Sequence, residues 1–507
     1  MSFTTLSQMV AAQNAANTAM TAPDGATPLS YGRLSQLIDD TQKRLNALGL
    51  GRGDRVGIVL PNCPEMATSF LAVAGACTAA PLNMAYRADE FEFYLSDVKA
   101  KAVVIAKGAE TPARAVAAKL GLRVLELVPQ ASEGTGCFTL EAEPLTGTSP
   151  TTGPAQAPDV ALILHTSGTT SRPKIVPLSH TNVCASARNI SRTLALTSAD
   201  RGLHIMPMFH IHGLIAGILA PWAVGSSIHC TPGFNALKFF GWMKECRPTW
   251  YTAVPTMHQT ILARAGGNAD VIAANPLRFI RSSSSSMPPQ VIAEVEAVFK
   301  APLIESYGMT EAAHQMASNP LPPAKRIPGS VGLAAGPEVA IMDNDGKLLA
   351  AEELGEVVIR GENVTLGYEN NPKANAEAFT HGWFRTGDQG RLDAEGYLTL
   401  TGRLKEIINR GGEKISPREV DEVIMDHPAV AQVVTFGMPH PKLGEEVAAA
   451  VVLREGQALT DKALRDFLAE RLADFKVPRK ILFMAEIPKG ATGKLQRIGL
   501  AEKLGLV

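Results

Sequence analysis

Short apolar runs with the character of β-strands alternate with amphipathic helical patterns in the first part of the chain. The strand-like runs are Arg55 to Leu60, Lys101 to Ile105 and Arg123 to Leu127, and a helical pattern covers Leu34 to Leu48. Such alternation is typical of α/β layers. With 507 residues the chain is too long for one ordinary core, and about 150 residues per domain predicts roughly three packed units. We therefore predict an α/β fold built from several subdomains.

Two places along the chain are predicted to be boundaries. Residues 141–158, EAEPLTGTSPTTGPAQAP, contain four prolines and no core-forming periodicity, which predicts a loop or a connection between subdomains. Near residue 404 the Gly-punctuated β-hairpin sequence DAEGYLTLTGR gives way to a helical segment. We expect a large N-terminal region, residues 1–403, of layered α/β subdomains plus a β-rich subdomain. A small C-terminal domain, residues 404–507, should follow.

The start of the predicted C-terminal helix carries strong capping signals. Ser416 and Glu419 have the spacing of a capping box, with Pro417 at the first helical position. The expected buried stripe of this helix consists of Val420, Val423 and Ile424. The rest of the segment reads strand, strand, helix, strand, which predicts a small α+β unit.

Charge and composition exclude several classes of protein. The 48 basic and 49 acidic side chains give a net charge of −1, so the chain lacks the electrostatic signature of a protein that binds nucleic acid or an anionic membrane. The longest apolar run, Ile211 to Val224, is about 14 residues, shorter than the roughly 20 that a membrane span requires. Six scattered cysteines without a CxxC pair argue against disulfides or zinc. No signal peptide or SKL ending is visible, so a cytoplasmic location is expected.

Residues 162–174, LILHTSGTTSRPK, run from an apolar strand into a loop suited to phosphate. Small residues allow close backbone approach to an anion, hydroxyls donate hydrogen bonds and a lysine adds positive charge. A polar surface turn is the plainer alternative, and the Walker pattern GxxxxGK[ST] is absent, which disfavours a Walker-type kinase or ATPase. The candidate phosphate ligands are Thr166, Ser167, Gly168, Thr169, Thr170 and Lys174.

This loop resembles the phosphate loop of the adenylate-forming superfamily, which contains acyl-CoA synthetases, luciferases and peptide-synthetase adenylation domains. Three further motifs follow in the family's order: ESYGMTE at 305–311, WFRTGD at 383–388 and PKGATGK at 488–494. The resemblance runs from about residue 25 to the end, so the chain is identified as a member of this superfamily. It implies ATP, Mg²⁺ and coenzyme A as ligands, a small-molecule carboxylate as substrate, and an acyl-adenylate intermediate.

The resemblance also implies roles for individual residues. Thr310 faces the α-phosphate, Glu311 holds Mg²⁺, Asp388 accepts hydrogen bonds from the ribose hydroxyls, and Arg403 is a second ribose or phosphate contact. Lys494 is the mobile catalytic lysine, although its motif in isolation would be an ordinary surface turn. The remaining implied positions are Ser306, Tyr307 and Gly308 at adenine, Lys405 at the hinge, and Gly411, Gly412, Glu413 and Lys414 in the CoA tunnel.

Two positions of the phosphate loop depart from the family pattern. Ser171 and Ile175 occupy places that are usually glycine, where a positive φ would be strained for other residues. The variant TSGTTSRPK followed by VPLSH is similar to the oxalate-CoA ligase branch, so we interpret the departures as a mark of that subgroup.

Several polar residues are candidates for substrate recognition. A lone histidine in an apolar stretch is more often a satisfied core residue, but here two lie in PMFHIHG, near RSSSSS and the histidine after YGMTE. Burying such groups unpaired against a fatty acid would cost about 1 to 3 kcal/mol each, whereas a small dicarboxylate would pair with them. The candidates are His210, His212, Ser283, Ser284, Ser285 and His314.

The segments FHIHGL, RSSSSSMPP, YGMTEAAHQM and SNPLP also resemble oxalate-CoA ligases. This resemblance implies that His314 and one serine, with Ser284 as first choice, contact the second carboxylate, and that His210 is the gate next to the acyl site. The expected reaction is oxalate plus ATP plus CoA to oxalyl-CoA, AMP and pyrophosphate. The alternatives are a malonyl-CoA synthetase, a 4-coumarate or fatty-acid CoA ligase, and a non-catalytic nucleotide or acyl-CoA binding protein.

Overall fold

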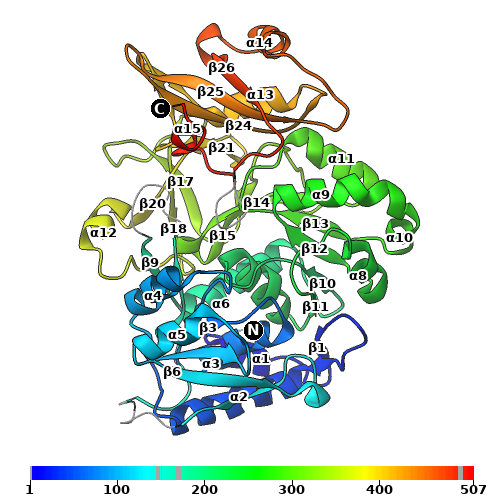
Figure 1. The fold of residues 1–507 in the computed structure, drawn as a ribbon, viewed down its shortest axis with the longest axis vertical. Coiled ribbons are helices and arrows are strands. Elements are labelled where there is room, and N and C mark those ends of the chain that lie inside the picture. The colour runs from blue at the N-terminus through cyan, green and yellow to red at the C-terminus, as the bar shows by residue number, and fades with distance from the viewer. Residues whose placement is uncertain (1–2, 144–148, 150, 167–172, 489–494, 507) are drawn as a thin grey trace.

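The computed structural model describes residues 3–506 apart from 144–148, 150, 167–172 and 489–494. Figure 1 shows the N-terminal layers at the bottom of the molecule, a β-rich region above them and the C-terminal residues at the top. The chain is a mixed α/β protein, as its alternating strand and helix patterns predict.

The first sheet has a parallel centre and an antiparallel strand at each edge. Its strand order is β7 (Phe138–Glu141), β6 (Arg123–Pro129), β5 (Ala102–Ala106), β3 (Arg55–Val59), β4 (Thr78–Pro81), β8 (Val160–His165) and β9 (Ile175–Ser179). Helices cover both faces: α2 (Tyr31–Ala47) and α3 (Pro64–Ala74) contribute to one core, and α4 (Ala88–Asp97) and α5 (Pro112–Lys119) to the other. Alternate residues of β3 face opposite cores, with Ile58 in one and Val59 in the other.

The second sheet is longer and supplies most of the candidate site. Its order is β16 (Leu333–Ala334), β15 (His314–Ser318), β14 (Leu303–Met309), β13 (Phe279–Ser282), β12 (Trp250–Ala253), β10 (Arg201–His204), β11 (Ser227–Cys230), β1 (Thr18–Thr21) and β2 (Leu29–Ser30). Strands β10 to β14 are parallel, so their carboxyl ends meet at one edge. Ligands of open α/β sheets bind at that edge.

Helices also cover both faces of this second sheet. One face carries α1 (Leu6–Ala11), α6 (His180–Thr193), the π-helix His212–Leu219 and α7 (Ala220–Trp222). The other carries α8 (Phe239–Cys246), α9 (Pro255–Ala265), α10 (Ala269–Ala274) and α11 (Pro289–Phe299). The apolar run from Ile211 to Val224 is thus a buried helical element, and no helix of the described residues is long and apolar enough to cross a bilayer.

Two smaller antiparallel units complete the chain. The β-rich unit contains β17 (Glu338–Met342), β18 (Gly355–Arg360), β19 (Phe379–Thr380), β20 (Trp383–Leu392), β21 (Leu398–Arg403) and α12 (Pro372–Ala378). The last sheet contains β22 (Ile408–Arg410), β23 (Glu413–Ile415), β24 (Val430–His440), β25 (Gly444–Leu453) and β26 (Lys480–Phe483), with α13 (Pro417–Met425), α14 (Asp461–Ala469) and α15 (Leu500–Lys503). The strand, strand, helix, strand order predicted for this last unit is present as β24, β25, α14 and β26.

The helix start at Ser416 differs in one respect from its predicted capping box. The Ser416 hydroxyl accepts a hydrogen bond from the Glu419 amide, and Pro417 is the first helical residue, as expected. However, the Glu419 carboxylate does not return to the Ser416 amide, because it is paired with Lys476 at 2.6 and 2.8 Å. The reciprocal half of the box is therefore replaced by an ion pair. In the predicted stripe, Val420 and Ile424 are buried and Val423 is half-buried.

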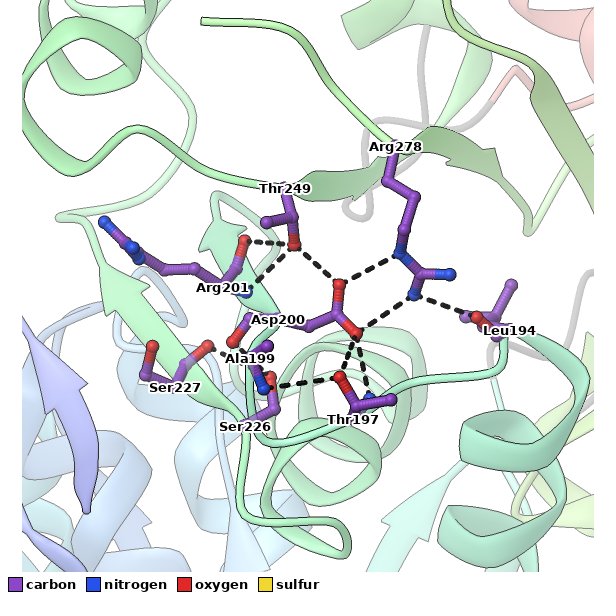
Figure 2. A network of polar contacts seen from close by, with 9 residues as sticks. All are labelled: Leu194, Thr197, Ala199, Asp200, Arg201, Ser226, Ser227, Thr249 and Arg278. Atoms are coloured by element: carbon purple, nitrogen blue, oxygen red, sulfur yellow. Dashed lines mark hydrogen bonds and ion pairs between the residues drawn. The ribbon is translucent and has the colours of Figure 1, made fainter.

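A buried carboxylate ties the amino ends of three neighbouring strands of the second sheet together. Asp200, which precedes β10, accepts hydrogen bonds from the Thr197 amide, the Thr249 hydroxyl and the Arg278 guanidinium (Figure 2). Thr249 precedes β12 and Arg278 precedes β13. The Asp200 side chain is only 6% exposed, so its charge needs these partners. The network lies at the edge of the sheet opposite the carboxyl ends of the strands, and its role is to stabilise the sheet.

Glu305 on β14 is a second buried carboxylate, and it gives a pH-dependent prediction. It accepts a hydrogen bond from the Gly329 amide, and burial raises its pKa to about 7. A carboxyl pKa that is higher in the folded than in the unfolded chain contributes stability at low pH that is lost as the pH rises through about 7. Glu305→Gln should therefore raise the free energy of unfolding by about 2 to 3 kcal/mol at pH 8 and by little at pH 5. Thermal melts at both pH values test this, and an equal shift at both would contradict it.

Candidate functional site

The ends of the predicted phosphate loop are fastened to each other on an antiparallel hairpin. β8 pairs with β9, and beyond His165 and Ile175 the Thr166 amide donates to the Lys174 carbonyl at 3.0 Å. In return, the Lys174 amide donates to the Thr166 hydroxyl at 3.2 Å. The other candidate ligands in the loop, Ser167, Gly168, Thr169 and Thr170, lie outside the described residues, as does Ser171.

The strain expected at Ile175 is absent, and that prediction is wrong. Ile175 is the first residue of β9, pairs directly with His165 and is not among the residues with a positive φ. An extended strand residue needs no glycine, and a β-branched side chain suits it. The isoleucine is also buried beneath the hairpin, at 4% exposure, where it adds to the core shared with α4 and α5.

Glu311 lies in a short 3-10 turn, Thr310–Ala312, that joins β14 to β15. Its side chain is buried, and the Tyr368 hydroxyl donates to Glu311 Oε1 at 2.8 Å. The Lys174 ammonium lies over the Tyr368 ring, 4.2 Å from the centroid. Burial raises the pKa of Glu311 above its ordinary value. The turn thus brings a carboxylate, a phenol and an ammonium together at the mouth of the loop.

The donor set at Glu311 fits a magnesium ion that arrives with a nucleotide. Among the described residues, no cluster of three or more histidine, cysteine, aspartate or glutamate side chains could form a metal cage. Magnesium does not need one, because it is commonly bound by one or two carboxylates together with substrate phosphates and water. Glu311 offers one hard oxygen donor beyond the oxygen that Tyr368 occupies. The residues present therefore suit the metal.

Asp388 is held from two sides at the point where β20 and β21 run side by side. Arg403 lies directly opposite it in the ladder and donates through Nε to Oδ1 at 3.0 Å. The Tyr307 hydroxyl donates to Oδ2. The charge of Asp388 raises the pKa of Arg403. Tyr307, predicted to lie at adenine, and Asp388, predicted to bind ribose, are therefore adjacent in space although they are 81 residues apart in the chain. Arg403, the second predicted ribose contact, lies beside Asp388.

Close backbone packing fixes the turn between β14 and β15. A Cβ atom at Gly308 would lie 1.8 Å from the carbonyl oxygen of His314, so only glycine fits there. Ala313 and His314 have φ values of 46° and 98°, which are uncommon for residues other than glycine. Such strain is typical of functional sites. His314 follows the Thr310–Ala312 turn and pairs with Met309 across it.

A polar cluster lies under the carboxyl ends of β12 and β13. His212, at the start of the π-helix, places Nδ1 3.0 Å from the Ser284 hydroxyl and Nε2 2.6 Å from the Thr252 hydroxyl. The rings of His212 and His314 stack with centroids 4.8 Å apart. All but Ser284 are buried. The structure thus unites three of the predicted substrate residues, which lie on three separate segments.

The other candidate substrate residues have different partners. The Ser283 hydroxyl donates to the Ser306 carbonyl at 3.0 Å, and the Ser285 hydroxyl donates to the Ser284 carbonyl at 2.8 Å. Of these three serines, Ser284 is the one bonded to a cluster histidine. The Ser306 hydroxyl is directed back to the Ser282 carbonyl at 3.3 Å. His210 is half-buried, with its ring 4.4 Å from that of Phe209.

The predicted hinge and CoA loop lie on the last sheet or next to it. Lys405 is exposed between the end of β21 and the start of β22. Gly411 and Gly412 form the two-residue turn from β22 to β23 with φ values of 60° and 100°. A positive φ at both central residues of a hairpin turn favours glycine. Glu413 and Lys414 are exposed on β23, and Lys494 lies outside the described residues.

Three residues of the site have no motif that predicted them. Tyr368 bridges Glu311 and Lys174, while Thr252 and Gln315 join the histidine cluster. Thr252 had a weak signal, since it is a polar residue in the middle of the apolar run WYTAV. Tyr368 follows an ordinary loop sequence and had none.

The predicted phosphate loop after β8, the buried Glu311 and the paired Asp388 are the groups expected of an enzyme that activates carboxylates with ATP. Residues 7–369 match the family of AMP-binding enzymes, and residues 419–494 match the AMP-binding enzyme C-terminal domain. The chain belongs to this family. It is an AMP-forming carboxylate-CoA ligase, with ATP and CoA as co-substrates. The non-catalytic alternative is therefore set aside.

Two relatives and one solved structure illustrate the kinship. The chain is 45% identical to the oxalate-CoA ligase of Arabidopsis thaliana over 479 residues, which cover 93% of each chain. It is 42% identical to that of Saccharomyces cerevisiae over 519 residues, covering 96% of this chain and 94% of the yeast protein. Its fold matches ATP-bound MatB from Rhodopseudomonas palustris with a TM-score of 0.88 at 29% identity, over 99% of this chain and 98% of that one.

Proposed function

We propose that this ligase converts oxalate, ATP and CoA to oxalyl-CoA, AMP and pyrophosphate. The observation that carries the proposal is the polar cluster of buried His212 and His314 with the half-buried Ser284, in which His314 follows the Thr310–Ala312 turn. A small dicarboxylate would satisfy these groups at one end and present its other carboxylate for activation. The relationship to two proteins named oxalate-CoA ligases supports the same substrate.

A long-chain acid is disfavoured by the same cluster. Leaving a buried histidine or hydroxyl unpaired against an alkyl chain would cost about 1 to 3 kcal/mol for each group. An aromatic acid such as 4-coumarate would meet the same penalty. Malonate is the nearest alternative, because it also carries a second carboxylate and is only one methylene longer.

The first half-reaction joins two anions, and positive charge must offset their repulsion. Two unit charges 4 Å apart repel by roughly 1 kcal/mol in water and about 4 kcal/mol at an effective dielectric of 20. Lys174, the hydroxyl-rich loop and Thr310 would hold the phosphates, and Lys494 would stabilise the charge that develops at the α-phosphorus. Magnesium on Glu311 would supply Lewis-acid neutralisation of the phosphates. The substrate carboxylate oxygen then displaces pyrophosphate and leaves an acyl-adenylate.

In the second half-reaction the CoA thiol displaces AMP from the acyl-adenylate. We assign residues 1–403 to the adenylating domain and 404–507 to a mobile domain that turns about Lys405. Turning would withdraw Lys494 and present Gly411 and Gly412, whose lack of side chains suits a slim pantetheine, together with Glu413 and Lys414. We place the enzyme in the cytoplasm, in oxalate degradation, and its six free cysteine thiols suit a reducing compartment.

A single panel of acids tests the substrate. AMP release with CoA is measured for oxalate, malonate, succinate, acetate, octanoate and coumarate at equal concentrations. We expect oxalate to give the highest kcat/KM, with malonate next. Good turnover of octanoate or coumarate without turnover of oxalate would overturn the substrate but not the ligase activity. Release of ADP in place of AMP would overturn the mechanism.

A further inference from the structure

Arg281 is a fully buried cation, and no side chain of the described residues gives it an acidic partner. It lies on β13 with 0% of its surface exposed, on the same side of the strand as Phe279. No ion pair to Arg281 exists among the described side chains, and burial alone lowers its pKa to about 9. Arg278, three residues earlier, has the opposite arrangement, because Asp200 neutralises it. A buried charge without a counter-charge is costly, so its presence here points to an anionic partner that the described residues do not supply.

The hydrogen bonds of Arg281 go to neutral acceptors in the polar cluster. Its Nη1 lies 3.3 Å from His212 Nε2 and from the Thr252 hydroxyl, and its Nη2 lies 3.2 Å from His314 Nε2 and 3.3 Å from Gln315 Oε1. One guanidinium therefore touches both stacked imidazoles. Figure 1 shows strands β12 to β15, which carry all of these residues except His212 of the π-helix, side by side.

These contacts favour one tautomer for each of the two imidazole rings. A guanidinium has five donors and no acceptor, so both histidines can only accept from it at Nε2, which favours a proton at Nδ1 on each ring. The Thr252 hydroxyl, 2.6 Å from His212 Nε2, can donate to that nitrogen in the same tautomer. His212 Nδ1–H then donates to the Ser284 hydroxyl oxygen at 3.0 Å. The Ser284 proton is consequently directed away from His212. The polar cluster therefore offers hydrogen-bond donors, among them the Ser284 hydroxyl. No carboxylate of the described residues lies against Arg281 to neutralise its charge.

We propose that Arg281 is a specificity-determining positioning residue. It holds His212 and His314 as Nδ1–H donors and supplies the buried positive charge that selects an acyl substrate with a second anionic group over the matching monoanion. This inference rests on the proposed function in so far as the second anionic group is a carboxylate. Arg281 acts through the imidazoles and Ser284, so it does not itself take part in adenylation.

The test compares oxalate with oxamate, its half-amide, which has nearly the same shape but one negative charge. In Arg281→Met we expect kcat/KM for oxalate to fall by about 100-fold, mainly through KM, and that for oxamate to fall by less than about fivefold. Arg281→Lys keeps the positive charge but cannot contact both imidazoles as the guanidinium does. It should restore oxalate activity to within about tenfold of wild type.

Arg278→Met is the matched control, because it removes an arginine from the same strand segment that has a structural partner. We expect it to lower the melting temperature and to leave the oxalate-to-oxamate ratio unchanged. Nitrogen spectra of ¹⁵N-histidine-labelled enzyme give a second readout. Two Nδ1–H imidazoles, assigned with His212→Asn and His314→Asn, should be present in wild type and lost in Arg281→Met.

The outcomes separate this inference from the proposed function. Equal losses for oxalate and oxamate in Arg281→Met, with unchanged histidine spectra, would overturn the role of Arg281 and leave oxalate as substrate. If wild type turns over malonate and not oxalate, the proposed substrate is wrong, and malonate with its half-amide gives the same comparison. Preference of the wild type for monocarboxylates would overturn both.

Discussion

Replacing Lys494 with alanine is expected to lower oxalate-dependent pyrophosphate exchange by about 100- to 1,000-fold, the usual cost of losing one group that stabilises transition-state charge. ATP binding should change little, because the phosphate loop and Asp388 hold the nucleotide in the ground state. Titration calorimetry measures the affinity for ATP, and labelled pyrophosphate measures the rate of exchange.

Two controls make the Lys494 test specific. Lys489→Ala removes a lysine from the same PKGATGK segment and should leave exchange near wild type. Thioester formation from synthetic oxalyl-adenylate and CoA should also survive Lys494→Ala, because that half-reaction does not involve attack on the α-phosphorus. If exchange survives, or if both half-reactions fall equally, the catalytic role of Lys494 is wrong.

Glu311→Gln is expected to lower kcat/KM by at least about 100-fold and to raise the magnesium concentration needed for half-maximal activity by about tenfold. The amide keeps the volume and the hydrogen bond from Tyr368 but loses the charge that a metal requires. Stability should not fall, since burial raises the pKa of Glu311 and therefore disfavours its charged form. Magnesium titrations of AMP release and thermal melts test both statements.

Glu305→Gln is the matched control for Glu311→Gln. Both residues are buried glutamates on one continuous segment, but Glu305 accepts a hydrogen bond from the Gly329 amide, whereas Glu311 accepts one from the Tyr368 hydroxyl. Glu305→Gln should leave the magnesium dependence unchanged. A comparable shift of the magnesium dependence in both variants would mean that Glu311 acts through stability. Tyr368→Phe leaves both carboxylates in place and should retain most activity.

The local elements were predictable because their signals are local. The strand runs at 55–60, 101–105 and 123–127 are strands β3, β5 and β6 with small changes at their ends. Ser416 caps its helix because a hydroxyl followed by Pro417 satisfies the first amides whatever the rest of the fold does. The capping partner of Glu419 was not predictable, since Lys476 lies 57 residues further along the chain.

The sequence by itself determined the ligase class, through motifs whose order and residue types follow from binding ATP. It also determined which serines and histidines were candidates for the acyl end. Only the tertiary structure decided that Ser284 and not Ser283 joins His212. It also decided that Arg281 contacts both imidazoles and has no acidic partner among the described residues. The reason is physical: strand pairing sets which side chains share a face, and burial sets what an unpaired charge costs. Neither quantity is visible until distant segments are brought together.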